Sequence, residues 1–85
     1  MNGLKDSSKD TTASLIAFGQ MIRTLRKARG WSQDEFAAYC NMHRTYIGSI
    51  ERGEQNISLK NIVKISRALN MRLSELFENF PDELD

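Results

Sequence analysis

The sequence predicts an all-α protein of five helices built around one small core. Apolar residues recur at helical spacing in four segments, and each segment ends at a glycine or an asparagine: Gly30, Asn41, Gly53 and Asn70. No segment shows the strict apolar–polar alternation typical of a half-buried strand. The chain has 85 residues, of which 40% are hydrophobic and 27% charged. These values fit one globular domain and leave no room for a second core.

The first predicted helix runs from about Thr12 to Arg29. Its apolar face consists of Leu15, Phe18, Met21, Ile22 and Leu25. The preceding stretch is polar, so we expect a flexible N-terminal arm over residues 1–11. The domain itself is predicted over residues 12–80, and an acidic tail over residues 81–85.

The second and third helices are predicted to form a helix-turn-helix. Ser32 and Glu35 form a capping box that begins the second helix, which buries Phe36, Ala37 and Cys40. Only residues 41–43 separate it from the third helix, which runs from about Arg44 to Arg52 with Ile47 and Ile50 inward. So short a link makes the two helices cross steeply. Purely structural helix pairs of this kind also occur, so the spacing alone leaves the function open.

The fourth helix is predicted to begin at its cap, Ser58, and to turn five residues inward: Leu59, Ile62, Val63, Ser66 and Leu69. A fifth helix from about Leu73 to Phe80 is stopped by Pro81. It carries four apolar residues, Leu73, Leu76, Phe77 and Phe80, more than one small domain is expected to cover. We expect them to form a homodimer interface, the alternative being that they fold back on the first and fourth helices of a monomer.

Charge is distributed unevenly along the chain. Residues 12–72 hold ten basic and four acidic residues, a net charge of +6, whereas residues 73–85 hold five acidic residues and no basic one, a net charge of −5. A basic body suits contact with a polyanion on one side, although scattered charge on a solvated surface gives the same count. Apolar runs are too short for a membrane span, and the first residues show no signal peptide, so a cytoplasmic domain is expected.

The chain offers no predicted catalytic or metal site and no cofactor site. Its single cysteine, Cys40, cannot form an internal disulfide. Together with the single histidine, His43, it provides too few ligands for a metal site. An enzyme needs a nucleophile with a base, or a metal, and a chain this small lacks depth for a closed active site. We therefore expect a binding protein.

The outward face of the third helix favours DNA as the ligand. At 100° per residue, this face carries Arg44, Thr45, Gly48, Ser49 and Arg52. Arg44 is placed to contact guanine O6 and N7, Thr45 and Ser49 to reach base edges, and Arg52 to contact a phosphate. Gly48 lowers the stability of the helix. A close approach of the helix to the floor of a DNA groove would offset this cost. The alternative for both arginines is a solvated helix face.

The residues from Gly30-Trp-Ser-Gln33 through Ala37 to Arg44-Thr-Tyr-Ile-Gly-Ser-Ile-Glu-Arg-Gly53 resemble the phage-repressor and Cro type (XRE-like) of helix-turn-helix. The wider sequence is most similar to the controller proteins of restriction–modification systems, which share the Phe18-Gly-Gln opening, the Arg44-Thr-Tyr46 start of the third helix and the Leu76-Phe77 ending. The resemblance covers about Phe18 to Phe77. It implies a five-helix lambda-repressor-like DNA-binding domain with the helix-turn-helix at helices 2–3.

The resemblance also implies roles for single residues. Base-contacting positions match Arg44, Thr45, Tyr46 and Ser49, and phosphate-contacting positions match Gln33, Asn56 and Ser58. A structural ion pair is implied between Arg26 and Glu51. In some relatives, acidic residues at the position of Asp34 and Glu35 contact RNA polymerase. His43 departs from the family, because imidazole is a poor cap for the third helix; it is either a surface residue or a pH-sensitive phosphate contact.

Taken together, the sequence predicts a dimeric, sequence-specific transcription regulator on a pseudo-palindromic double-stranded operator. The resemblance implies an autoregulatory controller, activator and repressor, of restriction–modification genes. The alternative is an antitoxin-type or protein-interaction module that masks a partner protein, with DNA binding secondary. The outward Arg44, Thr45 and Ser49 of the third helix favour the regulator. A long partner-wrapping extension, which would favour the alternative, is not apparent.

Overall fold

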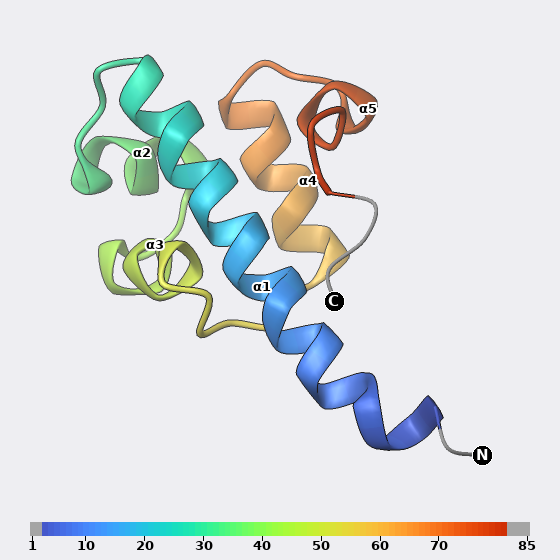
Figure 1. Ribbon diagram of the computed structural model, residues 1–85. Coiled ribbons are helices and arrows are strands. Elements are labelled where there is room, and N and C mark those ends of the chain that lie inside the picture. The colour runs from blue at the N-terminus through green and yellow to red at the C-terminus, as the bar shows by residue number, and fades with distance from the viewer. Residues whose placement is uncertain (1–2, 82–85) are drawn as a thin grey trace.

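The computed structural model describes the backbone of residues 3–81 and the side chains of residues 12–81. This part of the chain contains five helices and no strand: α1 (Gly3–Ala28), α2 (Gln33–Cys40), α3 (Arg44–Glu51), α4 (Leu59–Ala68) and α5 (Leu73–Leu76). The long helix α1 packs against α3, and α2 packs against both α3 and α4; in the view of Figure 1, α2 and α3 lie to the left of α1 and α4 and α5 to its right. The prediction of an all-α fold is confirmed.

The helix ends lie at the four predicted residues. Each takes a left-handed backbone conformation, with φ of 73° at Gly30, 57° at Asn41, 76° at Gly53 and 56° at Asn70. In every case the N–H of the residue that follows donates to the carbonyl five positions before it. At the end of α2, for example, Met42 donates to Ala37 at 2.9 Å. These are the hydrogen bonds of a Schellman motif, so local chemistry ends all four helices.

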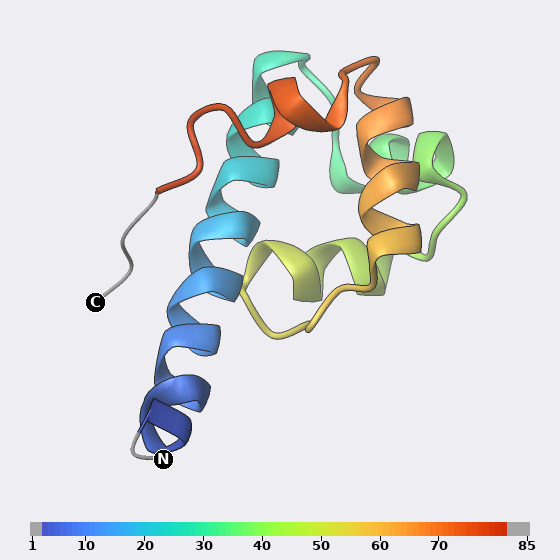
Figure 2. The same cartoon turned by 90° about the vertical axis from the view of Figure 1, so that its right-hand side faces the viewer.

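The start of α1 differs from the prediction. The helix begins at Gly3 and not near Thr12, so most of the expected flexible arm over residues 1–11 has helical backbone (Figure 2). Extending a formed helix adds one hydrogen bond for each residue fixed, whereas a separate helix must be nucleated. Polar residues can therefore continue a helix without an apolar face. The side chains of residues 1–11, and all of the tail beyond Pro81, lie outside the described residues.

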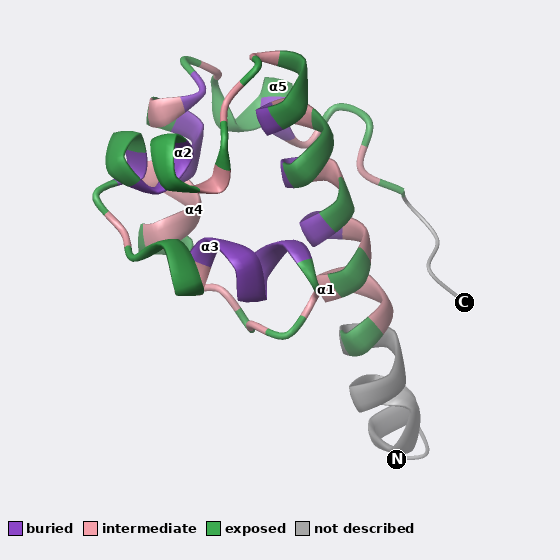
Figure 3. Cartoon of the chain, turned by 90° about the vertical axis from the view of Figure 1, so that its left-hand side faces the viewer, coloured by how far each residue is buried: buried purple, intermediate pink, exposed green. Residues whose placement is uncertain are grey.

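The core lies between α1, α2, α3 and α4, as the buried faces in Figure 3 show. Its most enclosed side chains are those of Ile22, Phe36, Ile47 and Ile65, each 0% exposed. The prediction that Leu59 points inward is wrong, because it is 69% exposed. As the first residue of α4, Leu59 lies before the part of the helix that packs on the core, where Ile65 is buried instead.

The fifth helix is shorter than predicted. It ends at Leu76 and not at Phe80, and the chain then continues in turns. Leu76 is 2% exposed and belongs to the core. The ring of Phe77 stacks on that of Phe18 at 5.7 Å, and Phe80 meets Phe77 edge-on at 5.6 Å. The aromatic residues after α5 therefore fold back on α1, the arrangement that the sequence left as an alternative.

Candidate nucleic-acid interface

A tight turn joins α2 to α3. The left-handed Asn41 ends α2, and α3 begins three residues later at Arg44. Ala37, whose carbonyl accepts from the N–H of Met42 at 2.9 Å in this turn, is only 3% exposed. His43 is the N-cap residue of α3, but its side chain makes no capping hydrogen bond. The prediction that imidazole caps this helix poorly is confirmed, and the backbone carbonyl of His43 accepts from the N–H groups of Tyr46 and Ile47.

A buried ion pair fixes α3 against α1. Arg26 donates from Nε to Oε2 of Glu51 at 2.7 Å and from Nη2 to Oε1 at 3.0 Å, while its Nη1 donates to the carbonyl of Trp31 at 2.8 Å. Arg26 is 7% exposed and Glu51 8%. The hydrogen bonds to Glu51 raise the pKa of Arg26, although burial opposes this. The pair that the family resemblance implied is therefore present and holds the helix in place.

Gln33 extends this network to the start of α2. Its Nε2 donates to Oε1 of Glu51 at 3.1 Å, and its side chain is half-buried. The amide group has a second N–H. Gln33 thus positions α2 on α3, and its predicted contact with a phosphate depends on the remaining donor.

The outward face of α3 presents Arg44, Thr45 and Arg52 to solvent. Each arginine lies beside a carboxylate. Nε of Arg44 is 3.3 Å from Oδ1 of Asp34, and Nε of Arg52 is 3.0 Å from Oε2 of Glu54. Both pairs are exposed, so each contributes little to the stability of the fold.

Two residues predicted to lie on this outward face are buried. Ser49 is 7% exposed, and its hydroxyl donates to the carbonyl of Tyr46 at 2.7 Å. Gly48 is buried as well, and a Cβ there would lie 3.1 Å from Nη1 of Arg52 and 3.8 Å from Oε1 of Gln33. A helical wheel gives the direction of a side chain but not the neighbours that cross over it. The exposed face is therefore narrower than predicted.

Tyr46 connects α3 to α4. Its hydroxyl accepts a hydrogen bond from Nδ2 of Asn61 at 3.1 Å, and its side chain is half-buried against the core. Sequence reasoning did not single out Asn61. Its position three residues after the cap Ser58, in the first turn of α4, is the sequence feature that could have identified it. Asn61 thus holds the ring of Tyr46, which the resemblance placed among the base contacts.

The segment before α4 keeps its predicted polar residues accessible. Asn56 and Ser58 are both exposed, and Oγ of Ser58 accepts from the backbone N–H of Asn61 at 3.2 Å, as a cap does. The positive end of α4 lies here, where backbone N–H groups favour an anion. A phosphate contact at these residues stays a prediction.

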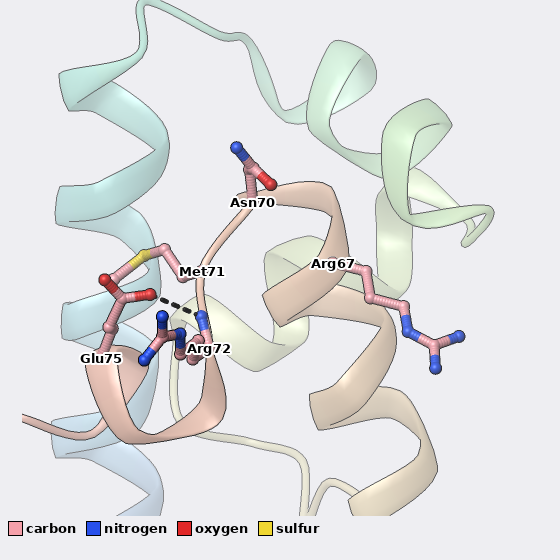
Figure 4. A pocket seen from close by; sticks show the side chains of 5 residues that line it. All are labelled: Arg67, Asn70, Met71, Arg72 and Glu75. Atoms are coloured by element: carbon pink, nitrogen blue, oxygen red, sulfur yellow. Dashed lines mark hydrogen bonds between the residues drawn. The ribbon is translucent and has the colours of Figure 1, made fainter.

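Two of the surface hollows in the described residues lie at α3 and at the α4–α5 turn. One, of about 500 Å³, adjoins the outward face of α3 and is lined by His43, Thr45, Tyr46, Ser49, Arg52, Glu54 and Gln55. The other, of about 370 Å³, lies at the α4–α5 turn and is drawn in Figure 4. There Glu75 accepts from the backbone N–H of Arg72 at 2.8 Å, which is a contact of the helix start. Its charged residues are exposed, so it is a surface depression and not an enclosed site.

Residues 12–81 contain no group of three or more histidine, cysteine or acidic side chains arranged to hold a metal ion. Every buried side-chain nitrogen or oxygen among them has a hydrogen-bond partner. In the part of the chain that the structure describes, no helix combines the length and the apolar character needed to cross a membrane.

The fold and the outward face of α3 define a helix-turn-helix protein. Residues 22–76 match the helix-turn-helix family HTH_3, and the chain belongs to that family. Control protein C.BamHI of Bacillus amyloliquefaciens is 45% identical over 64 residues, which cover 74% of this chain and 79% of that protein. Control protein C.MunI of Mycoplasma sp is 46% identical over 69 residues, which cover 80% and 93%.

Solved structures agree with these relatives. The restriction-modification controller protein C.AhdI from Aeromonas hydrophila superposes with a TM-score of 0.73 at 46% identity, over 76% of this chain and 98% of that one. The resemblance to controller proteins inferred from the sequence is confirmed. The chain is a DNA-binding transcription regulator of the helix-turn-helix type, which is not a class of enzymes.

Proposed function

We propose that this protein is a dimeric controller that binds a specific operator upstream of its own gene and regulates restriction–modification genes. It acts in the cytoplasm as a DNA-binding protein and has no enzymatic activity. The relatives named control proteins support the proposal, since the matches extend over most of both chains. The observation that carries it is the exposed Arg44, which stands on the first turn of a helix fixed by the Arg26–Glu51 pair.

The contacts divide between bases and phosphates. Arg44 and Thr45 are exposed at the start of α3 and are proposed to contact base edges, with Tyr46 beside them. Ser49 takes part only if its hydroxyl leaves the carbonyl of Tyr46. Phosphate contacts are proposed for four residues that flank this face: Gln33, Arg52, Asn56 and Ser58.

Dimerisation is proposed through the region of α5. Leu73 remains 39% exposed, and Phe77 and Phe80 are half-buried, whereas Leu76 belongs to the core and is unavailable. In a two-fold symmetric dimer the two copies of α3, the proposed recognition helix, lie about 34 Å apart, which is one turn of DNA. The operator is therefore expected to be pseudo-palindromic. A contact with RNA polymerase is proposed for the two exposed acidic residues at the start of α2, Asp34 and Glu35.

A gel shift on DNA from upstream of this gene tests the proposal. Wild type is compared with Arg44→Ala in excess random competitor DNA, and Arg67→Ala, an exposed arginine near the end of α4, is the matched control. Loss of base contacts by Arg44→Ala is expected to weaken specific binding by about 1–3 kcal/mol. The control should bind as wild type does. Binding by wild type no tighter than to random DNA would favour the partner-masking alternative.

A further inference from the structure

We propose that Asp34 is a positioning residue for base recognition by Arg44. Its carboxylate holds the Nε edge of the Arg44 guanidinium, so that the two Nη groups face the base. The inference rests on the proposed function, because it assigns to Asp34 a role that exists only when Arg44 contacts DNA.

The geometry places the two side chains together from different helices. Asp34 lies in the first turn of α2 and Arg44 in the first turn of α3, and their Oδ1 and Nε atoms are 3.3 Å apart. Gln33, next to Asp34 in the chain, is bound to Glu51 of α3 at 3.1 Å. The start of α2 is therefore fixed relative to α3, which keeps Asp34 within ion-pair distance of Arg44.

A guanidinium has five N–H donors in one plane, four of them on the two Nη atoms. When a carboxylate occupies the Nε edge, the Nη groups remain free to make the bidentate pair with guanine O6 and N7. Without that carboxylate, Arg44 can rotate and donate to phosphates or to other acceptors in the groove. Asp34 is thus expected to select one orientation of Arg44.

Exposure argues against a role in stability. The side chain of Arg44 is 64% exposed and that of Asp34 76% exposed, and ion pairs between such groups contribute little to folding. In a groove that excludes water, the same attraction becomes stronger. A carboxylate also repels nearby phosphates, a cost that only the correct base contact offsets, and this penalises binding to random DNA.

The Arg52–Glu54 pair provides a matched control on the same face. Arg52 donates to Glu54 at 3.0 and 3.1 Å, and both side chains are more than half exposed. Arg52 is proposed to contact a phosphate, which carries no sequence information. Removing the charge of Glu54 therefore changes the surface charge as Asp34→Asn does, without changing a base contact.

The experiment selects bound sequences from a randomised duplex library with five proteins: wild type, Arg44→Ala, Asp34→Asn, the double variant and Glu54→Gln. Circular dichroism first checks that each is folded. Wild type is expected to select a guanine in each half-site that Arg44→Ala no longer selects. Asp34→Asn should lower the preference for that guanine by about tenfold and leave other positions unchanged. It should also bind random DNA more tightly than wild type.

In the Arg44→Ala background, Asp34→Asn should leave the selected sequence as it is, and Glu54→Gln should select the wild-type sequence. If Asp34→Asn keeps the full preference for the guanine, or loses preference equally at all positions, the inference is overturned while the proposed function stands. The first of these results is also expected if Asp34 contacts only RNA polymerase. If Arg44→Ala selects the wild-type sequence, or wild type selects none, the proposed base contact fails and the inference fails with it.

Discussion

The backbone of α1 at Gly19 touches the end of α3 at Glu51. A Cβ on Gly19 would lie 2.7 Å from the carbonyl oxygen of Glu51 and 2.9 Å from its carbonyl carbon, and closer still to the carbonyl oxygen of Ile50. Glu51 is also the residue that pairs with Arg26. The position of α3 therefore depends on the lack of a side chain at Gly19 as well as on the Arg26–Glu51 ion pair.

Replacing Gly19 by alanine is expected to lower the free energy of unfolding by about 2–3 kcal/mol. The atoms that the new methyl group would meet belong to the backbone, so relief requires α3 to move away from α1. Urea denaturation followed by circular dichroism measures the change. A Gly19→Ala protein as stable as wild type would show that α1 and α3 are not in the close contact described here.

Gly48→Ala is expected to have the opposite sign and provides the matched control. Its Cβ would meet the far end of the Arg52 side chain at 3.1 Å, and that side chain is 59% exposed and free to shift. Alanine is the better helix residue by roughly 0.5–1 kcal/mol, so the free energy of unfolding should rise by up to that amount. The same urea experiment measures it, and a marked loss of stability would contradict the open position of Arg52.

The free energy of unfolding should depend on pH through Cys40 in alkaline solution. Burial raises the pKa of the Cys40 thiol from 9.0 to about 11, and the residue is 2% exposed. Between these values the folded protein holds a proton that the unfolded chain releases, so stability present below pH 9 falls as the pH rises towards about 11. Two pKa units correspond to about 2–3 kcal/mol.

Denaturation curves of wild type and Cys40→Ala between pH 8 and about 11 test this dependence. The substitution removes only the Cys40 thiol, so the difference between the two proteins, and not either curve alone, reports on Cys40. We expect that difference to change steadily above pH 9. Parallel curves over the whole range would contradict the raised pKa.

The features that the sequence predicted well are set by neighbours in the chain. Asn41 and Gly53 end their helices because each adopts a left-handed conformation at low cost, and Ser32 caps α2 through Glu35, three residues on. Each of these depends on contacts within about five residues. For this reason the helix ends and the helix-turn-helix spacing could be predicted without any tertiary contact.

The features that could not be predicted depend on what lies across from a residue. Ser49 and Leu76 are both buried, although the sequence pattern predicted an outward position for Ser49 and a dimer-interface position for Leu76. The ion pair of Asp34 with Arg44 joins two helices at a distance that periodicity does not give. The sequence therefore located the candidate surface on α3. Which of its residues are exposed, and which side chains they pair with, could be seen only in the structure.

The proposed dimer gives a final prediction. Leu73 is 39% exposed on α5 and is expected to lie in the dimer interface, so Leu73→Asp buries a charge there and should raise the dimer dissociation constant at least tenfold. Light scattering across a concentration series measures the mass of each protein. Leu59→Asp is the control, because Leu59 is a more exposed leucine at 69% and lies on α4. A wild type that stays monomeric, or equal effects of both substitutions, would reject dimerisation through α5.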